Sequence, residues 1–155
     1  MKNINRIKEN INYLIRNSLL IFTNQKRESK TILSSQKKNF KRNFNNLIKI
    51  KENVNKFTLL LLKKNSLKNI GFLLDKSWKL KMQLSNKISN NKIDLIYKKL
   101  INEGCYGGKL LGAGNGGFLF MVMSPNIKNK ILKKFNKYKI FQPDSDNYGT
   151  TIIKY

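Results

Sequence analysis

A cluster of glycines in the C-terminal half is the part of this sequence best suited to chemistry. Seven of the nine glycines lie between Gly104 and Gly117, and the tightest group is Gly112-Ala113-Gly114-Asn115-Gly116-Gly117. Every side chain in this hexapeptide except that of Asn115 is minimal, so a ligand or a neighbouring loop can approach the main chain closely. Successive N–H groups in such a loop can also form an anion-binding nest. We therefore expect a phosphate or a neighbouring loop to approach these six residues closely.

Two well-known phosphate-binding motifs do not fit the cluster. Gly112, Gly114 and Gly117 match the dinucleotide pattern G-x-G-x-x-G, but that motif must open a helix. Here the apolar run Phe118–Met123 follows and indicates a strand, and no G-K-[ST] ends the cluster as a Walker loop requires. The cluster is thus predicted to connect two strands. A loose hairpin that merely tolerates glycine is the alternative.

Other catalytic arrangements are excluded by composition. The chain has no His and a single Cys, so it cannot form a Ser-His-Asp triad, a His-ligated metal site or a CxxC zinc site. We expect no metal site and no catalytic residue in this chain, and we expect Cys105 to fill space beside the loop. The aspartates are too scattered to pair as acid and base: Asp75, Asp94, Asp144 and Asp146.

The formal net charge of +24 suggests an acidic partner, but the types of basic residue that carry it argue against one. Only four of the 32 basic residues are Arg, the residue preferred for bidentate phosphate and base recognition. Lys, Asn and Ile share A/T-rich codons, so genomic bias explains the charge and we predict no specific nucleic-acid partner. The alternative is a small basic module for RNA or another polyanion, which aromatics on an exposed sheet face would favour. Phe22, Phe118 and Phe120 instead lie in runs that look buried.

The hydrophobic pattern predicts an α+β sandwich in which helices surround a few strands. Helices are expected from apolar stripes at residues 4–15, 40–61, 67–78, 93–101 and 127–135, with Phe40, Phe44, Leu47 and Ile48 sharing one face. Trp78 lies on such a stripe and is expected in the core. Strands are expected at residues 18–23, 109–111, 118–123 and 150–155. No apolar run approaches the roughly 20 residues of a membrane span, and no leader is evident, so we expect a cytoplasmic protein without membrane contact.

The segment Glu103–Phe120 resembles the third motif of the GHMP kinases, the superfamily of galacto-, homoserine, mevalonate and phosphomevalonate kinases. Three further segments are similar to the sugar kinases that phosphorylate D-glycero-D-manno-heptose 7-phosphate. These are residues 20–23 with Arg27, residues 71–81 with their leucine–tryptophan–lysine pattern, and residues 89–97. The resemblance covers about residues 17–155, in the order of the family's motifs.

This resemblance implies a ferredoxin-like C-terminal domain, an antiparallel sheet packed against helices, over residues 17–155 after an N-terminal helix at 1–16. It implies γ-phosphate transfer from ATP, with Mg²⁺, to a hydroxyl of a sugar phosphate. The family's N-terminal ATP-loop domain, with its P-x-x-x-G-L-[GS]-S-S-[AS] loop, has no counterpart here, since the only prolines are Pro125 and Pro143. We therefore expect this chain to be inactive alone and to need a separate N-terminal half, unless it is an inactive kinase fragment.

Two cations lie nearest the matched motifs. Arg27 and Lys109 could each contact a sugar phosphate, although a solvated surface cation is an equally good interpretation in a chain with this much Lys. Asn115 stands where the family commonly has Gly. Asn tolerates a left-handed backbone better than other side chains do, so the loop is expected to keep its shape.

Overall fold

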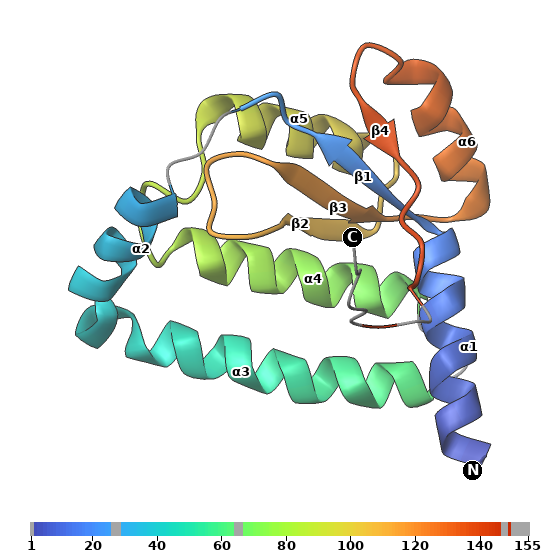
Figure 1. The fold of residues 1–155 in the computed structure, drawn as a ribbon, viewed down its shortest axis with the longest axis horizontal. Coiled ribbons are helices and arrows are strands. Elements are labelled where there is room, and N and C mark those ends of the chain that lie inside the picture. The colour runs from blue at the N-terminus through green and yellow to red at the C-terminus, as the bar shows by residue number, and fades with distance from the viewer. Residues whose placement is uncertain (1, 26–28, 64–66, 147–148, 150–155) are drawn as a thin grey trace, which may run out of the picture.

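A four-stranded antiparallel sheet forms the centre of the molecule (Figure 1). The computed structural model describes residues 2–25, 29–63, 67–146 and 149. The strands follow the order β2-β3-β1-β4 in the sheet. Their bounds are β1 Ser18–Phe22, β2 Gly107–Leu110, β3 Phe118–Val122 and β4 Ile140–Phe141. The expected antiparallel sheet, with a glycine loop between two of its strands, is confirmed.

The short edge strand β4 was not expected from the sequence. It has two residues, which pair with Leu20 and Ile21 of β1, and so few residues carry no alternating pattern. The closing strand expected at residues 150–155 lies outside the described residues.

The described part of the chain forms six helices around the sheet. All but the helix at Ser29–Lys38 lie close to the positions of the five apolar stripes given above. Two helix ends follow directly from capping chemistry. The Ser124 side chain accepts from the Ile127 N–H and Pro125 occupies the first turn of α6, while α5 stops where Gly104 takes φ +106°. The helices are α1 Lys2–Arg16, α2 Ser29–Lys38, α3 Phe40–Leu62, α4 Leu67–Met82, α5 Asn91–Asn102 and α6 Pro125–Lys134.

One face of the sheet carries the main core. Leu19 and Ile21 of β1 pack there with Leu119 and Met121 of β3, since alternate residues of a strand point to the same side. Helices α5 and α6 contribute the opposing apolar side chains, among them Ile93, Ile96, Leu100 and Ile131. Trp78 of α4 is fully buried in the same cluster, as expected.

Helix α4 approaches the backbone of β2 closely because both sides carry glycine. A Cβ on Gly107 would lie 2.1 Å from the Gly71 carbonyl oxygen, and a Cβ on Gly71 would lie 2.5 Å from the Tyr106 Cβ. Neither position accepts a larger residue without a shift of helix against strand. This contact holds α4 directly beside the strand that leads into the glycine loop (Figure 1).

On the opposite face of the sheet, the expectation that the phenylalanines are buried is wrong. Phe22, Phe118 and Phe120 are only partly buried, and Phe141 is 50% exposed. The ring centroids of Phe22 and Phe118 lie 5.1 Å apart and those of Phe118 and Phe141 lie 5.7 Å apart. An apolar run suggests burial on both faces of a strand, but on this face α1, α3 and α4 pack only around Phe120 and Val122.

Helix α3 buries amides and leaves aromatics outside. Phe40, Phe44 and Ile48 share a side of the helix, as the pattern predicts, yet all three are exposed. The buried side carries Asn43, whose Nδ2 donates to the Leu84 carbonyl at 2.8 Å, and Asn53, whose Nδ2 donates to Ser77 Oγ at 2.9 Å. These hydrogen bonds satisfy the buried amides, so burial costs them little.

Candidate phosphate-proximal loop

The glycine loop begins and ends in the β2–β3 hairpin and is fastened to the end of β1. The Leu111 N–H donates to the Phe118 carbonyl at 2.9 Å, which closes the base of the loop. Both the N–H and the Oγ1 of Thr23 donate to the Gly117 carbonyl, each at 2.9 Å. The C-terminal end of the loop is therefore held at the end of β1, 94 residues away in the sequence.

The tip of the loop is fastened to the segment before α5. The Asn115 N–H donates to the Ile88 carbonyl at 2.7 Å, and Asn90 Nδ2 donates to Asn115 Oδ1 at 2.7 Å. Asn90 is also the N-cap of α5, because its Oδ1 accepts from two backbone N–H groups of the first turn. Lys81 Nζ at the end of α4 donates to the Gly112 carbonyl. The loop shape is thus determined by two helices and a strand.

Backbone conformation explains why glycine is required in the loop. Gly112, Gly114 and Gly117 have φ of +76°, +130° and +95°, a region that other L-residues rarely occupy. Gly114 also lacks room for a side chain, because a Cβ there would lie 2.7 Å from the Ile88 carbonyl oxygen. Asn115 has φ +55°, so the expectation that an Asn at this position keeps the loop's shape is consistent with its left-handed backbone.

The loop can present N–H groups to an anion. Those of Gly112, Ala113, Gly114 and Gly116 donate to no other described residue. Gly114 and Gly116 are buried, whereas Gly112 is exposed and Ala113 partly so, which leaves the first half of the loop open to a ligand. The Lys81 ammonium adds positive charge at this end. Open backbone N–H groups of this kind are the ones from which anion-binding nests are built.

Of the two cations suggested by the sequence, only Lys109 lies within the described residues. Lys109 lines a pocket of about 190 Å³ between α3, α4 and the sheet, beside Phe57 and Leu74. No residue of the glycine loop lines that pocket. Arg27 lies outside the described residues.

A buried hydroxyl network just before the loop was not anticipated. Tyr97 on α5 shares its O–H between Asp75 Oδ1 at 2.8 Å and the Gly108 carbonyl at 3.1 Å. Lys79 Nζ lies 2.7 Å from Asp75 Oδ2. Burial, together with Asp75, raises the pKa of Tyr97 far above its usual value, so the hydroxyl stays protonated and joins α5 to α4 and β2. Asp75 and Tyr97 are 22 residues apart, so no local pattern could reveal the pair.

The remaining titratable groups offer neither a nucleophile nor a metal site. Cys105 is buried in the core, and burial, followed by the Glu103 charge, raises the pKa of its thiol to about 12. Glu103 pairs with Lys130 at 3.0 Å and with Lys134, which lowers the pKa of its carboxyl. Within the described residues, no three His, Cys, Asp or Glu side chains gather to hold a metal ion.

Comparison with known proteins agrees with this geometry. The family model for the C-terminal domain of GHMP kinases matches residues 58–140, which include α4, α5 and the whole loop. This chain belongs to the GHMP kinase family. The L. major mevalonate kinase, solved in complex with R-mevalonate, shares the fold of this C-terminal domain at TM-score 0.65 and 20% identity, over 83% of this chain and 43% of that one. The Methanococcus jannaschii mevalonate kinase matches at TM-score 0.63 and 26% identity, over 83% of this chain and 40% of that one.

The similarity extends to one sugar kinase by sequence. The D-glycero-alpha-D-manno-heptose 7-phosphate kinase of Campylobacter jejuni is 32% identical over 129 residues, which are 82% of this chain and 38% of that protein. The chain thus spans about two fifths of the length of the relatives it matches. None of the helices in the described ranges is long and apolar enough to cross a membrane.

Proposed function

We propose that this GHMP kinase C-terminal domain is one half of an ATP-dependent sugar kinase, acting on a heptose 7-phosphate or a related sugar phosphate in the cytoplasm. The observation that carries the proposal is the glycine loop, residues 112–117, whose backbone is fixed by Thr23, Ile88 and Asn90. The similarity to the Campylobacter jejuni heptose 7-phosphate kinase supports the substrate class.

In phosphoryl transfer the protein contributes mainly the positioning of the reactants and the stabilisation of charge. In phosphoryl transfer the γ-phosphate of ATP moves to the acceptor hydroxyl while negative charge spreads over its oxygens. In our proposal the open N–H groups of Gly112 and Ala113 and the Lys81 ammonium face this charge, and the absence of side chains lets the phosphate approach the backbone. ATP enters the scheme through the companion half. Mg²⁺ is not assigned to this chain, because its described carboxylates do not gather at the loop.

The companion half is an N-terminal GHMP domain that carries the ATP phosphate loop. We propose that residues 1–16 form an N-terminal helix and residues 17–155 the domain that packs against this companion, whichever polypeptide supplies it. Since the relatives are more than twice as long as the matched region, the activity belongs to the assembled enzyme.

A reconstitution experiment tests the proposal. The 155-residue chain is assayed for ATP-dependent phosphorylation of heptose 7-phosphate, alone and mixed with the part of the Campylobacter jejuni kinase that it does not match. We expect turnover only in the mixture. We further expect its loss with Gly114→Ala and its retention with Lys98→Gln, which removes an exposed charge on α5. Turnover by the chain alone would contradict the need for a second half, and a mixture that associates without turnover would favour an inactive kinase fragment.

The exposed aromatics favour polyanion binding as a second candidate function. Phe22, Phe118 and Phe141 form a contiguous, partly exposed row on the sheet face opposite the main core, where unpaired bases can stack. We expect single-stranded RNA, if it binds there, to lose affinity steeply with salt and to bind more weakly to Phe141→Ala. An affinity unchanged by Phe141→Ala would rule out this face.

A further inference from the structure

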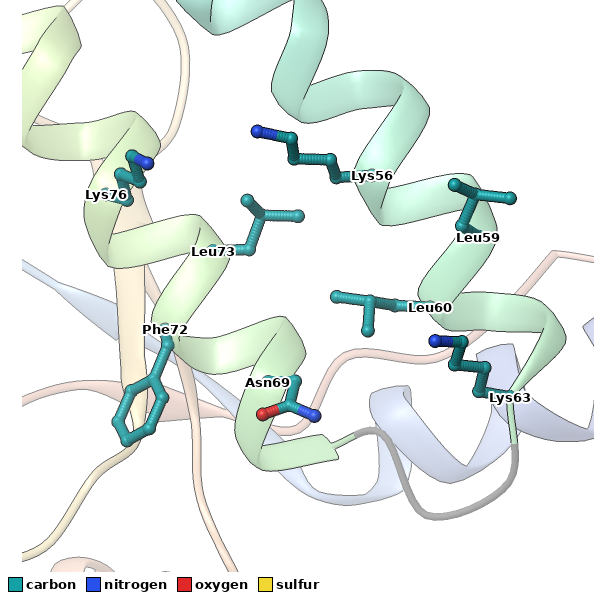
Figure 2. A pocket seen from close by; sticks show the side chains of 8 residues that line it. All are labelled: Lys56, Leu59, Leu60, Lys63, Asn69, Phe72, Leu73 and Lys76. Carbon is teal, nitrogen blue, oxygen red and sulfur yellow. The ribbon is translucent and has the colours of Figure 1, made fainter.

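A groove between α3 and α4 lies apart from the glycine loop and serves no role in the proposed kinase. Figure 2 shows the two helices side by side, with Leu60 and Leu73 pointing into the space between them and Phe72 at the outer edge. The groove has a volume of about 420 Å³, which is within the usual range for small-molecule sites of roughly 300–1,000 Å³. Its lining residues are Lys56, Leu59 and Leu60 of α3, Lys63 directly after it, and Asn69, Phe72, Leu73 and Lys76 of α4.

The middle of the groove is apolar and open to solvent. Leu60 and Leu73 are partly buried and lie between the helices, whereas Leu59 is 59% and Phe72 51% exposed. Large apolar side chains that gather around one hollow and remain exposed are typical of a binding surface. An apolar ligand placed there would remove this surface from water.

The ends of the groove are cationic. Lys56 and Lys76 stand on opposite helices and extend toward one another at one end, while Lys63 lies near Asn69 at the other (Figure 2). None of these three lysines forms an ion pair with a described carboxylate. The one acid of α4, Asp75, is already bound to Lys79 and Tyr97. Two ammonium groups that converge across a groove without an acid between them suit an anionic group of a ligand.

We propose that this groove binds an amphipathic anion, a single hydrocarbon chain with a phosphate or carboxylate head. The chain lies along Leu59, Leu60 and Leu73, and the head sits between Lys56 and Lys76. Inorganic phosphate would contact the lysines alone and leave the leucine side chains of the groove exposed to water. A neutral hydrocarbon would cover these side chains but leave both ammonium groups without a counterion.

Calorimetric titration of the purified chain with decyl phosphate, below its micelle concentration, tests the site. We expect saturable binding with one molecule per chain that an excess of inorganic phosphate does not displace, and no measurable binding of decyltrimethylammonium, which has the same tail and the opposite charge. Lys56→Gln and Lys76→Gln should each weaken binding about tenfold, the loss of one charge-assisted hydrogen bond. Leu59→Gln, at a side chain that contributes little to folding because it is exposed, should weaken the binding of the tail.

Lys98→Gln on α5 is the matched control, since it removes the same charge from an exposed helix position that does not line the groove. Equal weakening by Lys98→Gln would overturn the proposal in favour of attraction by the net charge. Equal binding of decyltrimethylammonium would overturn it in favour of unspecific apolar contact. Binding to vesicles of anionic phospholipid without binding of monomeric decyl phosphate would indicate a membrane surface instead of a single amphiphile. Amide shifts in an NMR titration should centre on α3 and α4, and shifts centred elsewhere would also contradict the site.

Discussion

Replacement of Gly114 by Ala tests whether the glycine loop depends on its contact with the segment before α5. The new Cβ would lie 2.7 Å from the Ile88 carbonyl oxygen, 2.9 Å from its Cα and 3.2 Å from its carbonyl carbon. All three are backbone atoms, so no side-chain rotation can relieve the overlap. The same carbonyl accepts the Asn115 N–H at 2.7 Å, so any movement that frees space also breaks that hydrogen bond.

The expected cost has two parts. A residue other than glycine at φ +130° is strained by about 1–3 kcal/mol, and forcing a methyl group into a filled site costs roughly another 1–3 kcal/mol. The alanine variant has a smaller conformational entropy in its unfolded state, which offsets about 0.4–1 kcal/mol of this cost. We therefore expect a loss of about 3 kcal/mol in the free energy of unfolding. At roughly 2–4 °C per kcal/mol for a chain of this size, the Tm should fall by about 6–12 °C.

Gly149→Ala is the matched control, because Gly149 also has a positive φ, +66°, but among the described residues no heavy atom outside its chain neighbours lies within 4 Å of its ideal Cβ. It should cost about 1 kcal/mol or less, since only the backbone strain applies. Urea denaturation of both variants, followed by circular dichroism, gives the two free energies directly. If Gly114→Ala and Gly149→Ala lost the same stability within about 0.5 kcal/mol, the close packing of the loop on Ile88 would be refuted.

Three further predictions concern one anchor of the loop, the buried thiol and the ion pairs of Glu103. Asn90→Ser keeps an N-cap oxygen but loses the bond to Asn115, so it should cost about 1 kcal/mol, and the cost should disappear in an Asn115→Gly background. Additive losses in that double-mutant cycle would show that the two side chains are independent. Cys105, with its pKa near 12, should react with thiol reagents at pH 8 only as fast as the protein unfolds, and rapid stoichiometric labelling of the folded protein would contradict its burial. The folded-state pKa of Glu103 is lowered, so its contribution is present above pH of about 4.5 and is lost as pH falls through the folded pKa. Glu103→Gln should therefore be less stable than the natural chain at neutral pH and equally stable in strong acid, whereas a constant difference at all pH values would refute the pairing.

The sequence was most informative where local chemistry decides the structure. Helix α5 has an apolar stripe, an Asn cap and a terminal glycine, so its type and both ends could be predicted within a few residues. The strands around the glycine loop followed from apolar runs bounded by glycine and Ser-Pro. In each case the decisive groups lie within one or two turns of the element they define.

Burial was less predictable because it depends on what covers each face. Phe118 and Leu119 are equally apolar neighbours, yet only Leu119 points into the main core. On the other face, α1, α3 and α4 pack around Phe120 and Val122, and Phe118 stays only partly buried. Helix α3 is the clearest case, since hydrophobicity alone would turn Phe44 inward and Asn43 outward. The Asn43 amide is inside because the Leu84 carbonyl, 41 residues away, accepts its hydrogen bond. Such a partner is invisible to any pattern of local spacing.

The same long-range contacts give the proposed function its physical basis. Thr23, Ile88 and Lys81 come from three separate segments of the chain, and together they fix the loop within this domain without help from a companion half. A loop that is already ordered need not lose conformational entropy when a partner or a phosphate arrives, so more of the contact energy remains for binding and for positioning the transferred group. A variant that loosens these anchors without unfolding the domain should therefore lower turnover in the reconstituted mixture more than it lowers stability. The Asn90→Ser variant offers that comparison, because it removes a loop contact and retains the helix cap.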